Sequence, residues 1–199
     1  MGIPPPGGGG GLSEGPLIVG LGGTVRPGST SELALARALE AARGAGARTE
    51  LFGGAFLGAL PIFDPRNASH HPECDRLLDA VRSAHGLIVA SPGYHGSISG
   101  LVKNALDCLE ALREDVRPYL DGRAVGCIVT ASGGQAAGST LAALRSIVHA
   151  LRGWPTPFGA TLASNGLFDG EGGFADPHDA WQVETVAAQV MAFAKAWQS

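Results

Sequence analysis

The chain has 199 residues, with 14 Lys and Arg against 18 Asp and Glu, and therefore a formal net charge of −4. This length favours one compact domain, and the content of 45% apolar and 16% charged residues argues against a largely disordered chain. The slightly acidic charge and the absence of a Lys/Arg cluster argue against a nucleic-acid-binding function, which needs a basic surface. Glycine is in excess at 31 residues without a Gly-X-Y period, so we expect many sharp turns or close backbone approaches.

The compartment follows from three further absences in the sequence. No apolar run approaches the roughly 20 residues that a membrane-spanning helix needs, and the N-terminus lacks the basic and apolar regions of a signal peptide. Residues 1–16 are rich in Pro and Gly, which predicts a flexible extension before one domain over residues 17–199. The odd set Cys74, Cys108 and Cys127 does not suit a disulfide framework. We therefore expect a cytoplasmic protein without membrane association.

The first segments of the domain alternate between strand and helix. Residues 17–21 form a short apolar run closed by two glycines, which predicts a buried strand. Residues 29–43 predict a helix, and Ser29 and Glu32 match the Ser-x-x-Glu pattern of a capping box at its start. Residues 48–52 predict a second strand, although this run is short and half polar.

The alternation continues to the C-terminus. Apolar residues at helical spacing or in short runs predict, in chain order, a helix at 73–84, a strand at 86–90, a helix at 98–113, a strand at 123–130, a helix that includes 140–151, a strand at 156–163 and a helix at 178–197. In the last helix we expect Trp181 and Trp197 to anchor the apolar stripe in the core. The stretch 110–121 is long for a simple turn and is expected to shape a substrate mouth or a subunit contact.

This order of elements indicates an α/β domain. Strands that alternate with helices predict βαβ units and a parallel sheet covered on both faces, which makes three layers. Two strand orders are common in such domains, the flavodoxin-like 2-1-3-4-5 and the Rossmann 3-2-1-4-5-6, and five strands favour the first. In the flavodoxin-like order, a ligand crevice lies beyond the carboxyl ends of strands 1 and 3. We therefore look for binding residues in the loops that follow these strands.

The loop after the first strand, residues 22–31, is rich in hydroxyl groups and leads into a helix. A helix N-terminus supplies unpaired N–H groups and a dipole that favours an anion, and Arg26 can add charge-assisted hydrogen bonds. The alternative is that Ser29 only caps the helix, but a cap needs no arginine. The predicted phosphate-binding residues are Thr24, Arg26, Ser29, Thr30 and Ser31.

Two better-known phosphate loops do not match this segment. The G-x-x-x-x-G-K-[ST] loop requires a lysine, and the lysines of the chain, Lys103 and Lys195, do not follow a glycine loop. The dinucleotide fingerprint G-x-G-x-x-G would begin at Gly20, but Val25 stands where its third glycine belongs. We therefore do not expect a dinucleotide on this loop.

The loops after the third and fourth strands complete the predicted crevice. Proline fixes its own φ, and glycines let backbone groups lie close to a flat ligand, against which a tyrosine or histidine can pack. Each of these residues taken singly is an ordinary surface residue, but their combination at the predicted crevice favours a ring-binding loop. The predicted residues are Pro92, Gly93, Tyr94, His95 and Gly96 after the third strand, and Ser132, Gly133, Gly134 and Gln135 after the fourth.

Two of these segments resemble motifs of the NADPH-dependent FMN reductase family. Residues 23–29 (GTVRPGS) resemble its G-[ST]-x-R-x-x-S phosphate loop, and residues 91–107 (SPGYHGSISGLVKNALD) look like its S-P-x-Y-[NH]-G-S…G-x-[LV]-K-N-A-[LI]-D signature. The resemblance covers about residues 17–163. It implies a flavodoxin-like fold, bound FMN, NAD(P)H as co-substrate, and a homodimer or homotetramer. It also implies that the first loop holds the phosphate, the second lines the isoalloxazine ring, and the third faces the other edge of that ring.

The resemblance implies an FMN-dependent NAD(P)H oxidoreductase, in which hydride passes from NAD(P)H to flavin and electrons then reach a quinone, a flavin or a similar small acceptor. The hydride step needs no acid–base pair, so we predict no catalytic side chain. The alternative is a flavodoxin-type electron carrier that binds FMN without oxidising NAD(P)H, but Arg26 and the charge of −4 argue against it. A receiver-like domain would need acidic residues where Gly22 and Ser91 stand. No metal site is predicted, because residues 70–74 lack zinc-ligand spacing.

Overall fold

The computed structural model describes residues 15–66 and 71–197. Its strands are β1 (Leu17–Gly22), β2 (Arg48–Phe52), β3 (Gly86–Tyr94), β4 (Ser97–Ile98), β5 (Ala124–Ala131), β6 (Trp154–Pro155) and β7 (Ala160–Ala163). Its helices are α1 (Thr30–Gly44), α2 (Gly54–Ala59), α3 (Pro72–Ser83), α4 (Gly100–Cys108), a 3-10 turn at Leu109–Leu112, α5 (Gly134–Ala150) and α6 (Pro177–Trp197). Almost all of the predicted extension, residues 1–14, lies outside the described residues, as does His70. Among the described helices, none is both long and apolar enough to cross a membrane.

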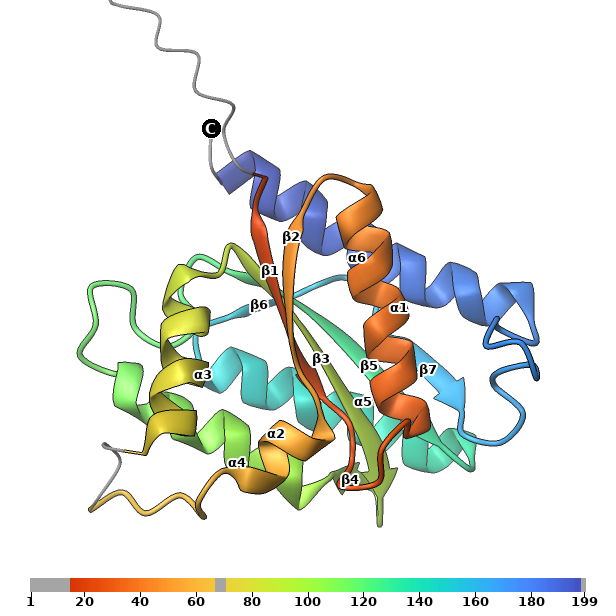
Figure 1. Cartoon of the computed structure of the whole chain (residues 1–199), viewed down its shortest axis with the longest axis horizontal. Coiled ribbons are helices and arrows are strands. Elements are labelled where there is room, and N and C mark those ends of the chain that lie inside the picture. Colours follow the sequence, from red (N-terminus) through yellow and green to blue (C-terminus); the bar gives the residue numbers. More distant parts are fainter. Residues whose placement is uncertain (1–14, 67–70, 198–199) are drawn as a thin grey trace, which may run out of the picture.

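The sheet has the predicted flavodoxin-like order. Its strands run β2-β1-β3-β5-β6, all in parallel, and helices cover both of its faces (Figure 1). Of the predicted fifth strand, residues 156–163, only the end is a strand, β7, which pairs with the end of β5. The short strand β6 comes before the predicted segment and pairs with the start of β5. Between β6 and β7, Pro157 has no N–H to donate to a neighbouring strand. The hydroxyl of Thr156 donates to the carbonyl of Phe158 in this break. The prediction of five strands is therefore wrong in number, while the order is confirmed.

Three other elements differ from the predictions. Strand β3 continues past residue 90 to Tyr94, although it contains Pro92. Because β1 ends opposite Ala90, the later part of β3 has a parallel neighbour only on the β5 side, and an edge position tolerates a proline. The short helix α2 was not predicted, and the predicted helix 98–113 is divided between α4 and the 3-10 turn.

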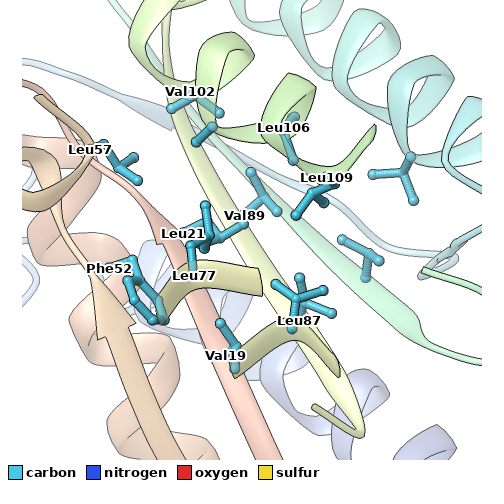
Figure 2. Close-up of a cluster of buried hydrophobic side chains, with 14 of the residues drawn as sticks. Val19, Leu21, Phe52, Leu57, Leu77, Leu87, Val89, Val102, Leu106 and Leu109 are labelled. Atoms are coloured by element: carbon cyan, nitrogen blue, oxygen red, sulfur yellow. The ribbon is translucent and has the colours of Figure 1, made fainter. Parts of the chain in front are cut away.

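Two apolar clusters hold the sheet between its helix layers. Alternation along β1 sends Val19 and Leu21 to the face covered by α3, α4 and α5, and sends Ile18 to the face covered by α1 and α6. Figure 2 shows the first cluster, in which Leu77 and Leu106 pack against strand residues. All eight residues of β5 are buried, as expected of a strand between two helix layers. This packing fixes the carboxyl ends of β1, β3 and β5 relative to one another.

The tryptophans of α6 are exposed. Trp181 is 51% exposed and Trp197 60%, whereas small residues such as Val186 and Val190 belong to the core cluster. The expectation that the two tryptophans anchor α6 in the core is therefore wrong.

The predicted capping box is wrong, because neither of its side chains bonds within α1. Ser29 makes no cap hydrogen bond, and its Oγ instead accepts from the N–H of Thr24 at 3.2 Å. The carboxylate of Glu32 accepts from the N–H of Gly54 at 2.7 Å, at the start of α2. A Cβ at Gly54 would overlap the carbonyl oxygen of Thr24. The start of α2 therefore contacts both the loop after β1, at Thr24, and the start of α1, at Glu32.

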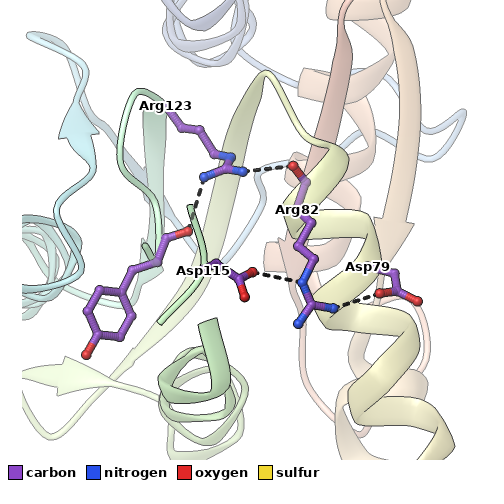
Figure 3. A network of polar contacts seen from close by, with 5 residues as sticks. Asp79, Arg82, Asp115 and Arg123 are labelled. Atoms are coloured by element: carbon purple, nitrogen blue, oxygen red, sulfur yellow. Dashed lines mark hydrogen bonds and ion pairs between the residues drawn. The ribbon is translucent and has the colours of Figure 1, made fainter. Parts of the chain in front are cut away.

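The stretch 110–121 lies at the amino ends of the strands, next to the side chain of Arg123. Arg123 is 1% exposed, and its guanidinium lies between this stretch and the end of α3 (Figure 3). It donates to the backbone carbonyls of Arg82, Ala84, Tyr119 and Asp121. No residue of this stretch lines the cleft at the carboxyl ends of the strands, so the expectation that it shapes a substrate mouth there is wrong. The alternative, a subunit contact, stays a prediction.

The three cysteines are free and buried, as their odd number indicated. Burial raises the pKa of the Cys74 thiol and raises the pKa of Cys108 and of Cys127 to about 12 each. Cys74 of α3 and Cys108 of α4 interact through their thiols, although they are 34 positions apart in sequence. These thiols therefore act as small apolar side chains of the core.

His85 is expected to make the stability of the fold depend on pH. Its Nδ1 accepts from the N–H of Leu17 at 3.0 Å, which requires an unprotonated nitrogen. Burial, together with the charges of Arg117, Arg48 and Arg123, lowers the pKa of His85 below 6.5. As the pH falls, the unfolded chain takes up the proton first, so the stabilisation present above pH 6.5 is lost on the way to the folded-state pKa.

The variant His85→Asn isolates this contribution, because asparagine keeps an acceptor and does not titrate. We expect the wild-type free energy of unfolding, measured by urea denaturation, to fall more between pH 7 and pH 5 than that of the variant. An equal fall in the two proteins would contradict the assignment.

Candidate functional site

A cleft of about 480 Å³ opens at the carboxyl ends of β1, β3, β5 and β7. Nine of the predicted site residues meet in its lining: Thr24, Arg26, Ser29, Thr30, Ser31, Pro92, Gly93, Tyr94 and Ser132. Of the described residues that line the cleft, Arg26 is the charged one. The site is therefore a polar cleft with one positive charge, at the edge where a parallel sheet of this order binds ligands.

The loop after β1 forms one wall of the cleft. Gly23 and Gly28 have φ of 111° and 65°, in the left-handed region where a side chain is strained. Between them, Thr24 Oγ1 accepts from the N–H of Arg26 at 3.2 Å, and Ser29 Oγ accepts from the N–H of Thr24. These contacts fold the loop over the start of α1, so that the unpaired N–H groups of its first turn border the cleft.

Ser31 is the residue of this wall that lacks a partner. It is 1% exposed, and its Oγ makes no hydrogen bond within the described residues. A buried hydroxyl without a partner costs about 1–3 kcal/mol, and this one lies at a helix N-terminus beside a cleft lined by Arg26. A hydrogen-bond acceptor with negative charge in the cleft would satisfy the hydroxyl, the helix N-terminus and the guanidinium together.

The β3–β4 hairpin forms the second wall. Gly93 pairs with Ile98 and Tyr94 with Ser97, which leaves a two-residue turn, and both turn residues have positive φ as in a type I′ turn. A Cβ on Gly93 would lie 2.9 Å from Thr140 Oγ1, so the strand rests directly on α5. The result is an ordered, flat wall that ends in Tyr94, whose side chain is 53% exposed.

Residues 16–167 of the chain match the model of the NADPH-dependent FMN reductase family. The chain belongs to this family. An FMN-dependent NADPH-azoreductase of Staphylococcus aureus is 40% identical over 81 residues, which are 41% of this chain. The match spans 39% of the length of that relative.

Solved structures of other proteins share the fold. FerB, a flavoenzyme NAD(P)H:(acceptor) oxidoreductase from Paracoccus denitrificans, superposes with a TM-score of 0.75 at 18% identity, over 91% of this chain and 98% of that one. The NADH:FMN oxidoreductase EMOB gives 0.68 at 19% identity, over 91% and 89% of the two chains. A flavodoxin of Streptococcus pneumonia TIGR4 gives 0.59 at 12% identity, over 88% and 98%. The flavodoxin-like fold is thereby confirmed.

The cleft of this FMN reductase family member fits a flavin mononucleotide in its donor set. One end offers donors that could hold a phosphate, namely the unpartnered Ser31 hydroxyl, a helix N-terminus and Arg26. The other wall, at Gly93, lines the cleft and rests directly on α5, which holds it in place for a flat ligand. Within the described ranges, no cluster of three His, Cys, Asp or Glu side chains forms a metal site beside it.

Five predicted site residues are not in the lining of the cleft: His95, Gly96, Gly133, Gly134 and Gln135. His95 and Gly96 form the tip of the hairpin turn, beyond the flat wall. Gly133 is the residue before α5, and Gly134 and Gln135 are in its first turn, because this helix begins six residues earlier than residue 140. The third predicted loop therefore contributes Ser132 alone to the lining.

Five lining residues were not predicted: Val25, Thr130, Ala131, Ser164 and Asn165. Ser164 follows β7, and its Oγ lies 3.1 Å from Ser132 Oγ, while its carbonyl accepts from Thr30 Oγ1 at 3.4 Å. It therefore ties three loops together at one edge. Ser164 could have been predicted from its position, because the loop after the fifth strand of a parallel sheet also lies at the carboxyl ends of the strands.

Proposed function

We propose that the chain is an FMN-dependent NAD(P)H oxidoreductase. The observation that carries the proposal is the unpartnered Ser31 hydroxyl, which lines the same cleft as Arg26, in the family-matched segment. When bound, FMN would supply the redox chemistry, taking hydride from NAD(P)H and delivering electrons to a small acceptor. The acceptor class we propose is a quinone, a flavin or a similar conjugated molecule, and the azoreductase relative adds azo compounds to this class.

The wall after β1 would bind the phosphate of FMN. Thr24, Thr30 and Ser31 offer hydroxyl donors, and Arg26 offers a charged one. The Oγ of Ser29 already accepts from the N–H of Thr24, so this serine mainly holds the loop in shape while keeping its own proton free to donate. Negative charge at the N-terminus of α1 is favoured by the helix dipole as well.

The wall made by Pro92, Gly93 and Tyr94 would orient the flat ring of the flavin. Pro92 and Gly93 are held in the β3 ladder and against α5, so a ring that stacks there meets an ordered surface and displaces water from it. Tyr94 can pack its exposed ring along the outer edge. We also propose that His95, Gly96, Gly133, Gly134 and Gln135 lie near the bound flavin without lining the cleft itself.

Location and assembly belong to the same proposal. Three free, buried cysteines agree with a reducing cytoplasm, and we propose a cytoplasmic homodimer or homotetramer that acts on small molecules. The flavodoxin-type carrier is the second candidate, because a flavodoxin shares the fold. The family match to NADPH-dependent FMN reductase favours the enzyme over the carrier.

One experiment separates these two functions. Purified protein is titrated with FMN, and NADPH is then added without oxygen while the flavin absorbance near 450 nm is followed, with free FMN as control. We expect the protein to bind FMN and NADPH to bleach the bound flavin. An added quinone is then expected to restore the flavin absorbance, with catalytic consumption of NADPH. Bound FMN that NADPH does not bleach would indicate the carrier, and failure to bind FMN would refute both.

The variant Ser31→Ala tests the phosphate end directly. In the flavin-free protein the change removes a buried, unpartnered hydroxyl, so we expect the free energy of unfolding to rise by about 1 kcal/mol. The FMN dissociation constant is expected to rise about tenfold, because a hydrogen bond to a charged group is lost. Exposed Ser146 of α5 provides the control Ser146→Ala, which tests the gain in helix propensity alone. Unchanged FMN affinity in Ser31→Ala would place the phosphate elsewhere.

A further inference from the structure

Glu32 places a carboxylate where an anion site would not be expected to have one. It directly follows Ser31 in the first turn of α1, at the helix end where the phosphate of FMN is proposed to bind. A negative charge at this end repels an anion, and the capping-box contact that would account for a glutamate here is not made. The half-buried side chain instead reaches the start of α2, where Oε2 accepts from the N–H of Gly54 at 2.7 Å.

Two glycines leave the space that this carboxylate fills. A Cβ on Gly23 would lie 2.6 Å from Glu32 Oε2, and a Cβ on Gly53 would lie 3.0 Å from the same atom. Gly23 belongs to the loop after β1, and Gly53 is the residue before α2. The carboxylate therefore lies between these two segments and connects both of them to α1.

Helix α2 supports the loop after β1. The backbone of Gly54 lies against that of Thr24, since a Cβ on Gly54 would overlap the Thr24 carbonyl oxygen. A Cβ on Gly58, about one turn later, would come within 3.3 Å of Val25 Cγ1. Helix α2 therefore contacts the two residues that precede Arg26, and both of these residues line the cleft.

Thr24 links this support to the proposed phosphate-binding groups. Its Oγ1 accepts from the N–H of Arg26 at 3.2 Å, and its own N–H donates to Ser29 Oγ at 3.2 Å. Arg26 is exposed, so the backbone of the loop decides where its guanidinium can reach. The contact between Glu32 and Gly54 therefore acts on Arg26 through α2 and Thr24.

We propose that Glu32 is a positioning residue for the phosphate of FMN, which acts through the reach of its carboxylate to Gly54 and not through its charge. This role rests on the proposed function, because it requires that the loop after β1 binds the phosphate. The contact orders the loop before the ligand arrives, so less conformational freedom is lost on binding. The ordered loop offsets the repulsion between the carboxylate and the phosphate.

Two variants separate reach from charge, because each of them keeps one of the two. Glu32→Gln keeps the length and an acceptor oxygen but removes the charge, whereas Glu32→Asp keeps the charge on a side chain that is one methylene shorter. We expect the FMN dissociation constant, measured by fluorescence quenching, to rise about tenfold in Glu32→Asp. In Glu32→Gln we expect it to stay at the wild-type value or to fall.

The matched control for the loss of charge is Glu40→Gln, at an exposed residue of the same helix, which is expected to leave FMN binding unchanged. A change in affinity confined to Glu32→Gln would assign the effect to charge and would overturn the proposal. An equal rise of the dissociation constant in Glu32→Gln and Glu32→Asp would overturn it as well.

Riboflavin, which lacks the phosphate, tests whether the effect belongs to the phosphate end. We expect the wild type and Glu32→Asp to bind riboflavin equally, because Glu32 contacts the loop after β1 and α2 on the other wall from Pro92 and Gly93. A loss of riboflavin affinity as large as the loss of FMN affinity would show a general loosening of the cleft and would contradict a role at the phosphate.

Amide hydrogen exchange, followed by NMR, tests the contact in the flavin-free protein. We expect the N–H groups of Gly54 and Thr24 to exchange faster in Glu32→Asp than in the wild type and in Glu32→Gln. Unchanged exchange at Thr24 in Glu32→Asp would overturn the role of Glu32 while the proposed function stands. A wild type that binds no FMN would instead refute the proposed function itself.

Discussion

Replacing Arg123 by methionine is expected to lower the free energy of unfolding by about 3 kcal/mol or more. Methionine has a similar length but no donor, so four backbone carbonyls lose the guanidinium as their donor, although the carbonyl of Asp121 still accepts from Arg117. Figure 3 shows the contact with Arg82. Each buried acceptor left unsatisfied costs about 1–3 kcal/mol. Part of this is offset, because burial already opposes the charge and lowers the pKa of Arg123 to about 10. The lost hydrogen bonds are expected to outweigh the gain from removing a buried charge, because they join the end of α3 to residues 119–121.

Urea denaturation of the wild type and of Arg123→Met measures this loss, provided that the two transitions have equal slopes. The matched control is Arg113→Met, which removes an exposed guanidinium whose partners are Glu110 and Glu114 at 3.5 Å each. Exposed pairs contribute about 0–1 kcal/mol, so this control is expected to stay close to wild type. Equal losses in the two variants would show that the carbonyls around Arg123 find other donors.

Replacing Arg26 by alanine is expected to raise the FMN dissociation constant about ten- to a hundredfold. The guanidinium is the charged group of the cleft lining, and it lies in the loop whose other donors are neutral. A hydrogen bond to a charged partner contributes about 1.5–3 kcal/mol, which corresponds to this range of affinity. The fold should be unaffected, because Arg26 is exposed and its N–H, which bonds to Thr24, is retained in alanine.

Arg43→Ala is the matched control for Arg26→Ala. Arg43 is in the last turn of α1, about 20 Å along the helix from its first residue. The substitution removes the same charge from the chain as Arg26→Ala. Quenching of free FMN fluorescence on binding measures both affinities, and a salt series separates local from long-range charge effects. Equal affinities in the two variants would remove Arg26 from the phosphate site.

Most of the fold follows from the alternation of apolar runs and helical periods. The strand order was predicted from the count of five alternating strands, and the order is correct although the structure has more strands than five. The end of β3 was missed, because a proline normally ends a strand and its one-sided neighbourhood is a property of the assembled sheet. The break before β7 was missed for a related reason. The effect of Pro157, which has no N–H to donate, depends on how its strand pairs with β5 in the assembled sheet.

The sequence predicted those residues of the candidate site that stand close together in one loop. Arg26 and Ser31 were identified from one loop, and the structure places both in the cleft lining. The capping box failed because the pattern of Ser29 and Glu32 is local, whereas the N–H that Glu32 binds belongs to Gly54. Ser164 was missed because its contacts with Thr30 and Ser132 join positions more than 30 residues apart.

The buried thiols have a consequence for the chemistry proposed at the cleft. Quinones are electrophiles that add to thiolates, and a protein that reduces them meets them repeatedly. Burial raises the pKa of Cys108 and Cys127 to about 12 each, so both thiols stay protonated at neutral pH. The folded chain therefore offers such acceptors almost no sulfur to arylate, and its resistance to these molecules lasts for as long as the core stays closed.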